Sequence, residues 1–310
     1  MHATAPECQM IASISPDDMR EVDRKMLDAI RLGENLHLHS KLVNGANIAA
    51  IYHLKSGGQR IRARLALHSA HCLNLNKKDG IVLAATAELI HNASLIHDDL
   101  QDRDEIRRRV ATVWVAYGDD VAICAGDLLL SAAYSTIAGV SCVDKLPHLI
   151  NLVHSCVTRA IGGQCADFSS ASIKSLGVDE YLKITTAKSG SLLGLPMELA
   201  LLAADYPVAL DVTRSTINSF AAGYQIFDDL CDLEADIARG EVVPALNVVQ
   251  VLQKNNAMTS HRAWESAKKL GLKHLQVAAT GSLDLPLQSG RLLQELANDL
   301  IAQLKNKCSP

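Results

Sequence analysis

Helical patterns fill most of the chain, and only one short run favours a strand. Apolar residues recur with helical spacing across 81–95, 209–237 and 286–306, whereas strand-like alternation is confined to 110–115 (VATVWV). Aromatic residues make up only 4% of the sequence, so the core must consist mainly of Ala, Leu, Ile and Val, and small residues favour close helix packing. We therefore predict one all-α domain over residues 1–310, with residues 1–15 as a flexible N-terminus.

Several helix boundaries carry their own signals. Residues 15–18 (SPDD) combine a capping hydroxyl, a first-turn proline and two acids suited to the helix dipole. Asp79 opens one long apolar pattern, Asp119 precedes another, and Asp179 is a candidate cap for a third helix. Gly162 and Gly163 lie inside a further predicted helix.

The composition excludes several classes of protein. With 30 basic and 34 acidic residues the net charge is −4, so we expect no nucleic-acid partner. The first ten residues lack the layout of a signal peptide. The longest apolar candidate, 121–143, contains Asp127 and several hydroxyl groups, so we expect no membrane span. None of the eight cysteines forms a CxxC pair, which predicts buried thiols in a reducing compartment and a cytoplasmic protein.

Two acidic clusters repeat the pattern DDxxD. The first is Asp98, Asp99 and Asp102, and the second is Asp228, Asp229 and Asp232. On a helix, spacings of three and four residues place each set of carboxylates on one face. One such patch alone could be a solvated surface, but both follow strongly apolar runs, where repelling charges need a cation. Mg²⁺ takes one or two carboxylates and completes its shell with water and phosphate, so two facing clusters would bind a diphosphate through several ions.

Basic and polar side chains accompany the clusters. Arg107, Arg108 and Arg109 follow the first cluster closely, and Arg62 lies in a Gly-then-Arg segment, 57–62 (GGQRIR). Arginine side chains bind phosphate through paired hydrogen bonds. His91 lies two helical turns before Asp98, and Lys188 with Ser189 offers a cation and a hydroxyl group. Each of these alone has a structural alternative, such as a solvated arginine face or a structural histidine.

These motifs together resemble the trans-isoprenyl diphosphate synthases, all-α prenyltransferases that elongate allylic diphosphates with isopentenyl diphosphate. The similar segments run in the family's order over most of the chain: 57–62 (GGQRIR), 88–109 (ELIHNASLIHDDLQDRDEIRRR), 117–130 (YGDDVAICAGDLLL), 162–168 (GGQCADF), 188–190 (KSG) and 223–232 (GYQIFDDLCD). The resemblance implies an isoprenoid-synthase-type helical bundle around a central cavity, and a homodimer.

The resemblance also implies a role for each residue. Three Mg²⁺ ions would join the allylic diphosphate to Asp98, Asp102 and Asp228, with Asp232 as a further ligand and Asp99 and Asp229 in support. Arg107, Lys188 and Gln225 would contact the allylic diphosphate, Arg62, His91, Arg108 and Gln59 would hold isopentenyl diphosphate, and Ser189 is a further substrate-binding candidate. The predicted catalytic set consists of Lys188 and five of the six aspartates: Asp98, Asp99, Asp102, Asp228 and Asp229. Ionisation of the C–O bond would give an allylic cation, which the homoallylic double bond attacks, and diphosphate would take the proton.

The chain departs from the family pattern at three cationic or small positions. Gln59 stands where the family has Lys, Arg109 where Gly follows the double Arg, and Glu241 where a final Lys follows a segment that is shortened here. Each lost charge-assisted contact is typically worth about 1.5–3 kcal/mol. These departures bear on the use of isopentenyl diphosphate more than on metal-assisted ionisation.

Small side chains before the first cluster bear on product length, and the scarcity of aromatic residues bears on the type of reaction. Ala93 and Ser94 stand where bulky residues close the chain pocket in the family, so we predict a product of about C20 or longer. A class I terpene cyclase or unusual prenyl coupling enzyme is the alternative, favoured by Gln59. A non-catalytic partner subunit of a prenyl synthase is the second alternative. The scarcity of aromatic residues, with only Tyr224 and Phe227 beside the second cluster, favours an open aliphatic tunnel and hence elongation.

Overall fold

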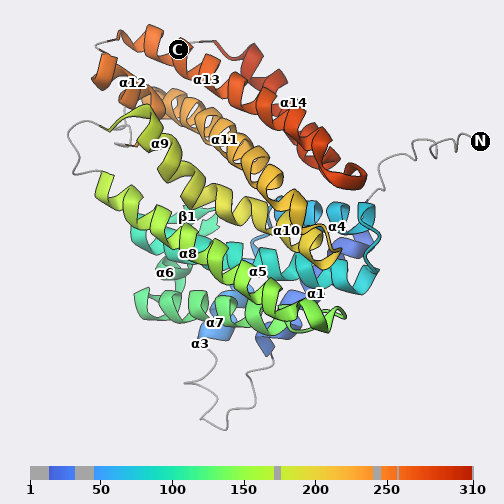
Figure 1. The fold of residues 1–310 in the computed structure, drawn as a ribbon. Helices are drawn as coiled ribbons and strands as arrows, with labels where there is room; N and C mark the ends of the chain where they lie inside the picture. Colours follow the sequence, from blue (N-terminus) through green and yellow to red (C-terminus); the bar gives the residue numbers. More distant parts are fainter. Residues whose placement is uncertain (1–13, 32–44, 171–175, 240–245, 257, 309–310) are drawn as a thin grey trace, which may run out of the picture. The chain divides into compact units, whose positions relative to one another are not determined.

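The computed structural model describes residues 14–31, 45–170, 176–239, 246–256 and 258–308. The chain divides into two compact units, Met1–Val140 (unit 1) and Ser141–Pro310 (unit 2). Apart from one two-stranded ribbon, the regular structure of the described residues is helical (Figure 1), so the prediction of an all-α fold is confirmed. The single-domain assignment remains a prediction. The first thirteen residues and Glu241 lie outside the described part of the chain.

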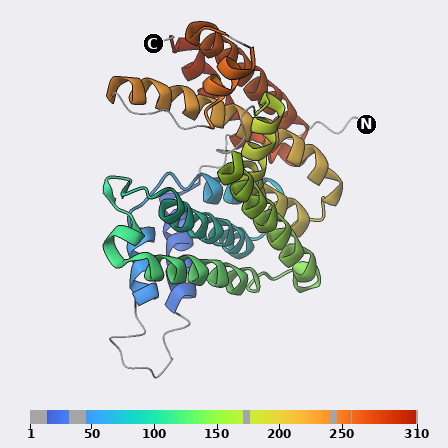
Figure 2. The same cartoon turned by 90° about the vertical axis from the view of Figure 1, so that its left-hand side faces the viewer.

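Unit 1 is built around one long helix, α5 (Lys77–Asp102), which packs against α4 (Ile61–Cys72), α7 (Asp119–Ile137) and α1 (Pro16–Arg31). The other elements of this unit are α3 (Gly45–Lys55), β1 (Ile106–Arg107), β2 (Val110–Ala111) and α6 (Val113–Tyr117). Most side chains of α5 between Asp79 and Ala93 are buried, so this helix forms the centre of the unit. Figure 2 shows its elements from a second side, in blue to green.

The helix-start signals in unit 1 are confirmed with one correction. At the start of α1, Asp18 N donates to Ser15 Oγ at 3.1 Å and Ser15 N donates to Asp18 Oδ2 at 2.9 Å. Helix α5 begins before Asp79, because Asn76 is its N-cap and Asn76 Oδ1 accepts from Asp79 N at 2.8 Å. Asp79 therefore lies in the first turn, where an acid also favours the helix dipole.

The predicted strand at 110–115 is only partly a strand. Val110 and Ala111 pair with β1 in antiparallel register, Ala111 opposite Ile106. From Val113 the chain is helical, and Thr112 caps this turn by accepting Ala116 N at 3.0 Å through its carbonyl oxygen. The alternating pattern also fits this short helix, because Val113 is buried and Val115 is 46% exposed.

Unit 2 is a layered set of helices in which α11 (Leu210–Arg239) packs on α13 (Ser260–Gly281), and α13 packs on α14 (Arg291–Asn306) (Figure 1). Helix α10 (Ser191–Ala203) packs against α8 (Leu146–Ser170) and α11. The remaining elements are α9 (Val178–Thr185), the π-helical turn η2 (Thr186–Gly190), α12 (Val248–Asn256) and the short 3₁₀ turns η1 (Val143–Lys145), η3 (Pro207–Ala209), η4 (Ser282–Asp284) and η5 (Pro286–Gln288).

Small residues allow the close packing that the composition predicts. A Cβ atom on Gly223 of α11 would lie 2.6 Å from Leu275 Cγ of α13, and one on Gly271 of α13 would lie 2.9 Å from Ile226 Cγ2. The predicted cap at Asp179 is wrong: Gly177 is the N-cap of α9, and its N–H donates to Glu180 Oε2 at 2.8 Å. The placement of the paired glycines at 162–163 within a helix is confirmed, because both lie in α8.

Helix α7 is the one helix among the described residues that is long and apolar enough to cross a membrane. It packs against α5 and α3 within unit 1, and 44% of its most apolar window is buried there. Core helices of globular proteins meet the same criterion, so this feature is weak evidence for a span.

Candidate active site

The first acidic cluster lies in the last turn and a half of α5. Asp98 is half-buried, Asp99 is 1% exposed and Asp102 is exposed. The chain then leaves the helix and returns through β1, which brings Arg107 back to Asp99: Arg107 Nε donates to Asp99 Oδ1 at 2.5 Å. Burial raises the pKa of Asp99, and the Arg107 hydrogen bond and charge oppose that rise. Burial lowers the pKa of Arg107, but its interactions with Asp99 outweigh this and the net shift is upward.

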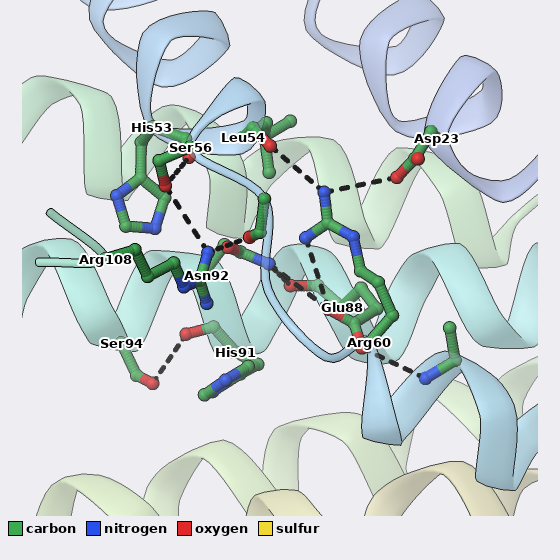
Figure 3. A network of polar contacts seen from close by, with 12 residues as sticks. Asp23, His53, Leu54, Ser56, Arg60, Glu88, His91, Asn92, Ser94 and Arg108 are labelled. Carbon is green, nitrogen blue, oxygen red and sulfur yellow. Dashed lines mark hydrogen bonds and ion pairs between the residues drawn. The ribbon is translucent and has the colours of Figure 1, made fainter. Parts of the chain in front are cut away.

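Arg108 is held by the glycine loop that precedes α4. Its guanidinium donates to the carbonyl oxygen of Gly57 and lies 3.4 Å from Ser56 Oγ. Gly58 has a φ of +131°, which strains any other residue, and a Cβ atom there would lie 2.7 Å from Arg108 Cζ and push the guanidinium aside. The GGQRIR and RRR segments, whose residues the family resemblance assigns to one substrate, therefore lie together through the contacts of Arg108 (Figure 3).

Arg60, in the same loop, has a structural role. Its side chain is 10% exposed, donates to Leu54 O at 3.1 Å and forms ion pairs with Asp23 (3.2 Å) and Glu88 (3.6 Å) (Figure 3). Glu88 also caps α4, because its Oε1 accepts from Ala63 N at 3.0 Å. These contacts fix the loop to α5, which carries His91 and the aspartates.

Two histidines lie among the arginines of unit 1. His53 is 4% exposed, and burial, followed by the charges of Arg108 and Arg107, lowers its pKa to about 3. Burial and then the charges of Arg62 and Arg108 lower the pKa of His91 well below its usual value. Both rings are therefore neutral in a strongly positive field, which favours an anion such as a phosphate group.

Unit 1 thus brings together most of its predicted substrate-binding residues. Arg62, His91 and Arg108 interact electrostatically, and Arg107 is close enough to affect His91 as well. Gln59 is exposed in the loop beside them. His53 was not predicted. Its only sequence signal is a histidine at the end of a helix just before the glycine pair.

The second acidic cluster lies on α11 in unit 2. Burial, followed by repulsion from Asp232 and Asp229, raises the pKa of Asp228 to about 7. Burial also raises the pKa of Asp229 to about 6, although hydrogen bonds from Gln225 Nε2 (3.0 Å), Val248 N (2.7 Å) and Tyr181 Oη (2.9 Å) oppose the shift. Gln225, predicted to contact diphosphate, thus supports Asp229. Asp232 is exposed.

Lys188 lies in the π-helical turn η2, where extra residues per turn often mark functional sites. Lys188 Nζ donates to Asp167 Oδ2 at 2.7 Å, and Ser189 is half-buried beside it in the same turn. A Cβ atom on Gly163 of α8 would lie 2.7 Å from Lys188 Cα, so glycine is needed for this turn to pack on α8. The sequence signal for Asp167 was present in GGQCADF at 162–168, but its pairing with Lys188 was not predicted.

The two clusters meet the requirements of Mg²⁺ better than those of a closed protein-only metal site. Within the described residues, no three His, Cys, Asp or Glu side chains converge on one point as a metal site would need. Mg²⁺ takes one or two carboxylates, with water and phosphate oxygens completing its octahedron. Burial is the largest cause of the raised pKa of Asp228, and repulsion from Asp232 and Asp229 adds to it; a bound cation would offset both effects.

Comparison with solved structures identifies the fold. The geranylgeranyl pyrophosphate synthetase of Pyrococcus horikoshii superposes with a TM-score of 0.78 at 22% identity, covering 92% of this chain and 96% of that one. The decaprenyl diphosphate synthase of Rhodobacter capsulatus gives a TM-score of 0.78 at 18% identity, over 95% and 98% of the two chains. At these identities the likeness shows the fold, which is that of an isoprenoid synthase.

Sequence comparison identifies the family. The polyprenyl synthetase family model matches residues 46–241. The geranylgeranyl pyrophosphate synthase of Geoglobus acetivorans is 33% identical over 231 residues, 72% of this chain and 68% of that protein. The farnesyl diphosphate synthase of Bacillus subtilis is 32% identical over 193 residues, 59% of this chain and 65% of that protein. The chain belongs to the polyprenyl synthetase family, and the prediction of a trans-isoprenyl diphosphate synthase enzyme is confirmed at that level.

Proposed function

We propose that this protein is a Mg²⁺-dependent prenyltransferase that condenses an allylic diphosphate with isopentenyl diphosphate to a trans-prenyl diphosphate of about C20 or longer. The observation that carries the proposal is the end of α5, where Arg107 of β1 binds the carboxylate of Asp99 and interacts electrostatically with Asp98. Carboxylates and guanidinium groups in one place suit a diphosphate, which binds through metal ions and directly through arginine.

The residues divide into groups by the chemistry that each offers. Metal ligands in the proposal are Asp98, Asp102, Asp228 and Asp232. Asp99 and Asp229 orient their neighbours, since both are buried and hydrogen-bonded within the protein. Direct contacts to phosphate oxygens would come from Arg107 and Lys188 for the allylic substrate, and from Arg62, Arg108 and His91 for isopentenyl diphosphate.

The protein's part in the reaction is to position charge and exclude water. Asp98, Asp102, Asp228 and Asp232 would hold Mg²⁺, three ions in the proposal, which would supply positive charge to the leaving diphosphate. Arg107 and Lys188 hold the oxygens of the departing diphosphate while the C–O bond ionises, so charge develops beside fixed cations. Arg108 and the neighbouring groups hold isopentenyl diphosphate so that its double bond reaches the allylic cation, and the released diphosphate accepts the proton.

One assay separates this function from its alternatives. Purified protein is incubated with C10, C15 and C20 allylic diphosphates and Mg²⁺, with and without isopentenyl diphosphate. Longer diphosphates that form only with isopentenyl diphosphate support elongation. Hydrocarbon or alcohol formed without it would support a cyclase or coupling enzyme, the alternative that Gln59 favours. No turnover, with capture of a second synthase, would support the partner-subunit alternative.

Product length, assembly and location complete the proposal. Ala93 and Ser94 leave the last turns of α5 without a bulky side chain before Asp98, so a product limited to C10 or C15 would contradict the C20 proposal. A homodimer is proposed from the family, and light scattering tests it. The cysteines among the described residues form no disulfide bond with one another, in keeping with the reducing, cytoplasmic location that we propose.

A further inference from the structure

Tyr181 links the helix that leads into the Lys188 turn to the second aspartate cluster. Its side chain is 0% exposed, and its hydroxyl group donates to Asp229 Oδ2 at 2.9 Å. Helix α9, which carries Tyr181, ends at Thr185 and continues directly into η2 with Lys188. Thr185 forms a hydrogen bond with the same tyrosine. A phenol group at this point therefore connects two parts of unit 2 that are 48 residues apart in sequence.

Both carboxylate oxygens of Asp229 accept hydrogen bonds from neighbouring elements of unit 2. One of its oxygens accepts from Tyr181 and from Val248 N, the first residue of α12, while the other accepts from Gln225 Nε2. The carbonyl oxygen of Asp229 accepts from Asn247 Nδ2 at 2.9 Å. The carboxylate thus joins α9, α11 and α12, and most of its acceptor capacity is used by the protein rather than by a metal ion.

We propose that Tyr181 is a positioning residue that acts through Asp229 to fix Asp228 relative to the Lys188 turn. The inference rests on the proposed function, in which both groups act on one diphosphate. Asp228 is adjacent to Asp229 in α11, so a shift of the anchored carboxylate moves its neighbour. Lys188 is held from the other side by Asp167 at 2.7 Å and by the close packing of η2 on Gly163. Partners that orient metal-binding groups in this way commonly change metal affinity or activity by about 10- to 100-fold when removed.

The test is Tyr181→Phe, which keeps the ring and removes the hydroxyl group. We expect the Mg²⁺ concentration for half-maximal rate and the KM for the allylic diphosphate to rise about tenfold, while the KM for isopentenyl diphosphate stays unchanged. Tyr206→Phe, the same change at a half-buried site in unit 2, is the matched control. A Tyr181→Phe enzyme that matches the control in Mg²⁺ dependence and KM, or differs only in melting temperature, would overturn the proposal.

Two further measurements distinguish loss of the positioning role from a folding defect and from failure of the proposed function. Thr185→Val removes the hydroxyl group beside Tyr181 and should shift the Mg²⁺ dependence in the same direction by a smaller factor, so no shift would count against the link. Calorimetry with inorganic diphosphate and Mg²⁺ measures the coupling without turnover. If the wild type elongates no allylic substrate, the proposed function fails, whereas weaker Mg²⁺-dependent diphosphate binding by Tyr181→Phe still supports the positioning role and unchanged binding refutes it.

Discussion

The two aspartate clusters share one sequence pattern but are stabilised in different ways. In unit 1 the middle residue, Asp99, is paired with the Arg107 guanidinium. In unit 2 the middle residue, Asp229, is held by neutral donors: a phenol, an amide side chain and a backbone N–H. Burial raises the pKa of both middle residues; at Asp99 the hydrogen bond and charge of Arg107 oppose the rise, whereas at Asp229 only neutral donors oppose it and the pKa is about 6.

The comparison teaches that DDxxD contains two kinds of aspartate. In both clusters the middle residue is nearly inaccessible, with exposures of 1% and 5%, and is bonded within the protein. The outer residues are more exposed, on the same helix face and one turn apart. This difference favours the outer residues as the proposed metal ligands and the middle residue as the group that fixes their orientation.

Replacing an outer aspartate tests this division with the largest expected effect. Asp98→Ala and Asp228→Ala should each reduce turnover by about 10³-fold or more, because each removes a charge that stabilises the developing negative charge through Mg²⁺. Steady-state assays with saturating allylic diphosphate measure the loss. Asp211→Ala, in the first turn of the same helix as Asp228 and 97% exposed, is the control. Activity retained by Asp98→Ala would overturn the metal assignment.

The units also differ in how glycine supports their cations, and a pair of neighbouring glycines tests this. In unit 2, Gly163→Ala would force a methyl group against the backbone at Ala187 and Lys188, and should destabilise the protein by about 3 kcal/mol. Gly162→Ala meets no atom within 4 Å and should instead stabilise by about 0.5–1 kcal/mol through helix propensity. Urea unfolding measures both. Equal effects of the two substitutions would show that η2 does not depend on this contact.

Lowering the pH should change the folding stability contributed by His53 in unit 1 and by Asp228 in unit 2 in opposite directions. The pKa of His53 is about 3 in the folded protein and about 6.5 in the unfolded chain, so its contribution to stability is complete above pH 6.5 and is lost as pH falls. At pH 5 the loss is about 2 kcal/mol. Asp228, with a raised pKa, acts oppositely: protonation below about pH 7 relieves its burial and so favours the folded state.

The His53→Gln variant isolates the unit 1 contribution. The difference in free energy of unfolding between wild type and His53→Gln should shrink by about 2 kcal/mol from pH 7.5 to pH 5, measured without metal by urea unfolding at each pH. His71→Gln, at an exposed position in unit 1, is the matched control measured at the same pH values. A pH-independent difference for His53→Gln would mean that burial and the neighbouring arginines do not hold this ring neutral.

Much of the fold could be predicted because its signals are local. The cap at Ser15 and the apolar spacing of α5 and α11 depend on neighbouring residues, and these helices were predicted correctly. The segment at 110–115 was misjudged, since two strand residues and a helical turn both satisfy its alternation. Its outcome depends on where the short hairpin with β1 ends, after the pair Ile106–Ala111, and the alternation alone does not mark that point.

The candidate site was also predictable only where its signals are local in the sequence. The aspartates, arginines and Lys188 were found from motifs, but the partners that orient them come from other segments. Tyr181 reaches Asp229 across 48 positions, and Glu88 meets Ala63 N across 25. Single buried residues of this kind leave no repeated pattern, so only the tertiary structure reveals them.

The smallest expected effect concerns the one cation that unit 1 lacks relative to its family. Gln59→Lys adds a charge at an exposed loop position beside Arg60 and near the positive field around His91. A new charge-assisted contact of about 1.5 kcal/mol would lower the KM for isopentenyl diphosphate about tenfold, with the KM for the allylic substrate unchanged. Gln276→Lys, also at an exposed position, is the control for net charge. If the KM stays constant, the arginines and histidines of unit 1 already supply the binding that the family draws from lysine, and Gln59 gives no reason to favour a cyclase.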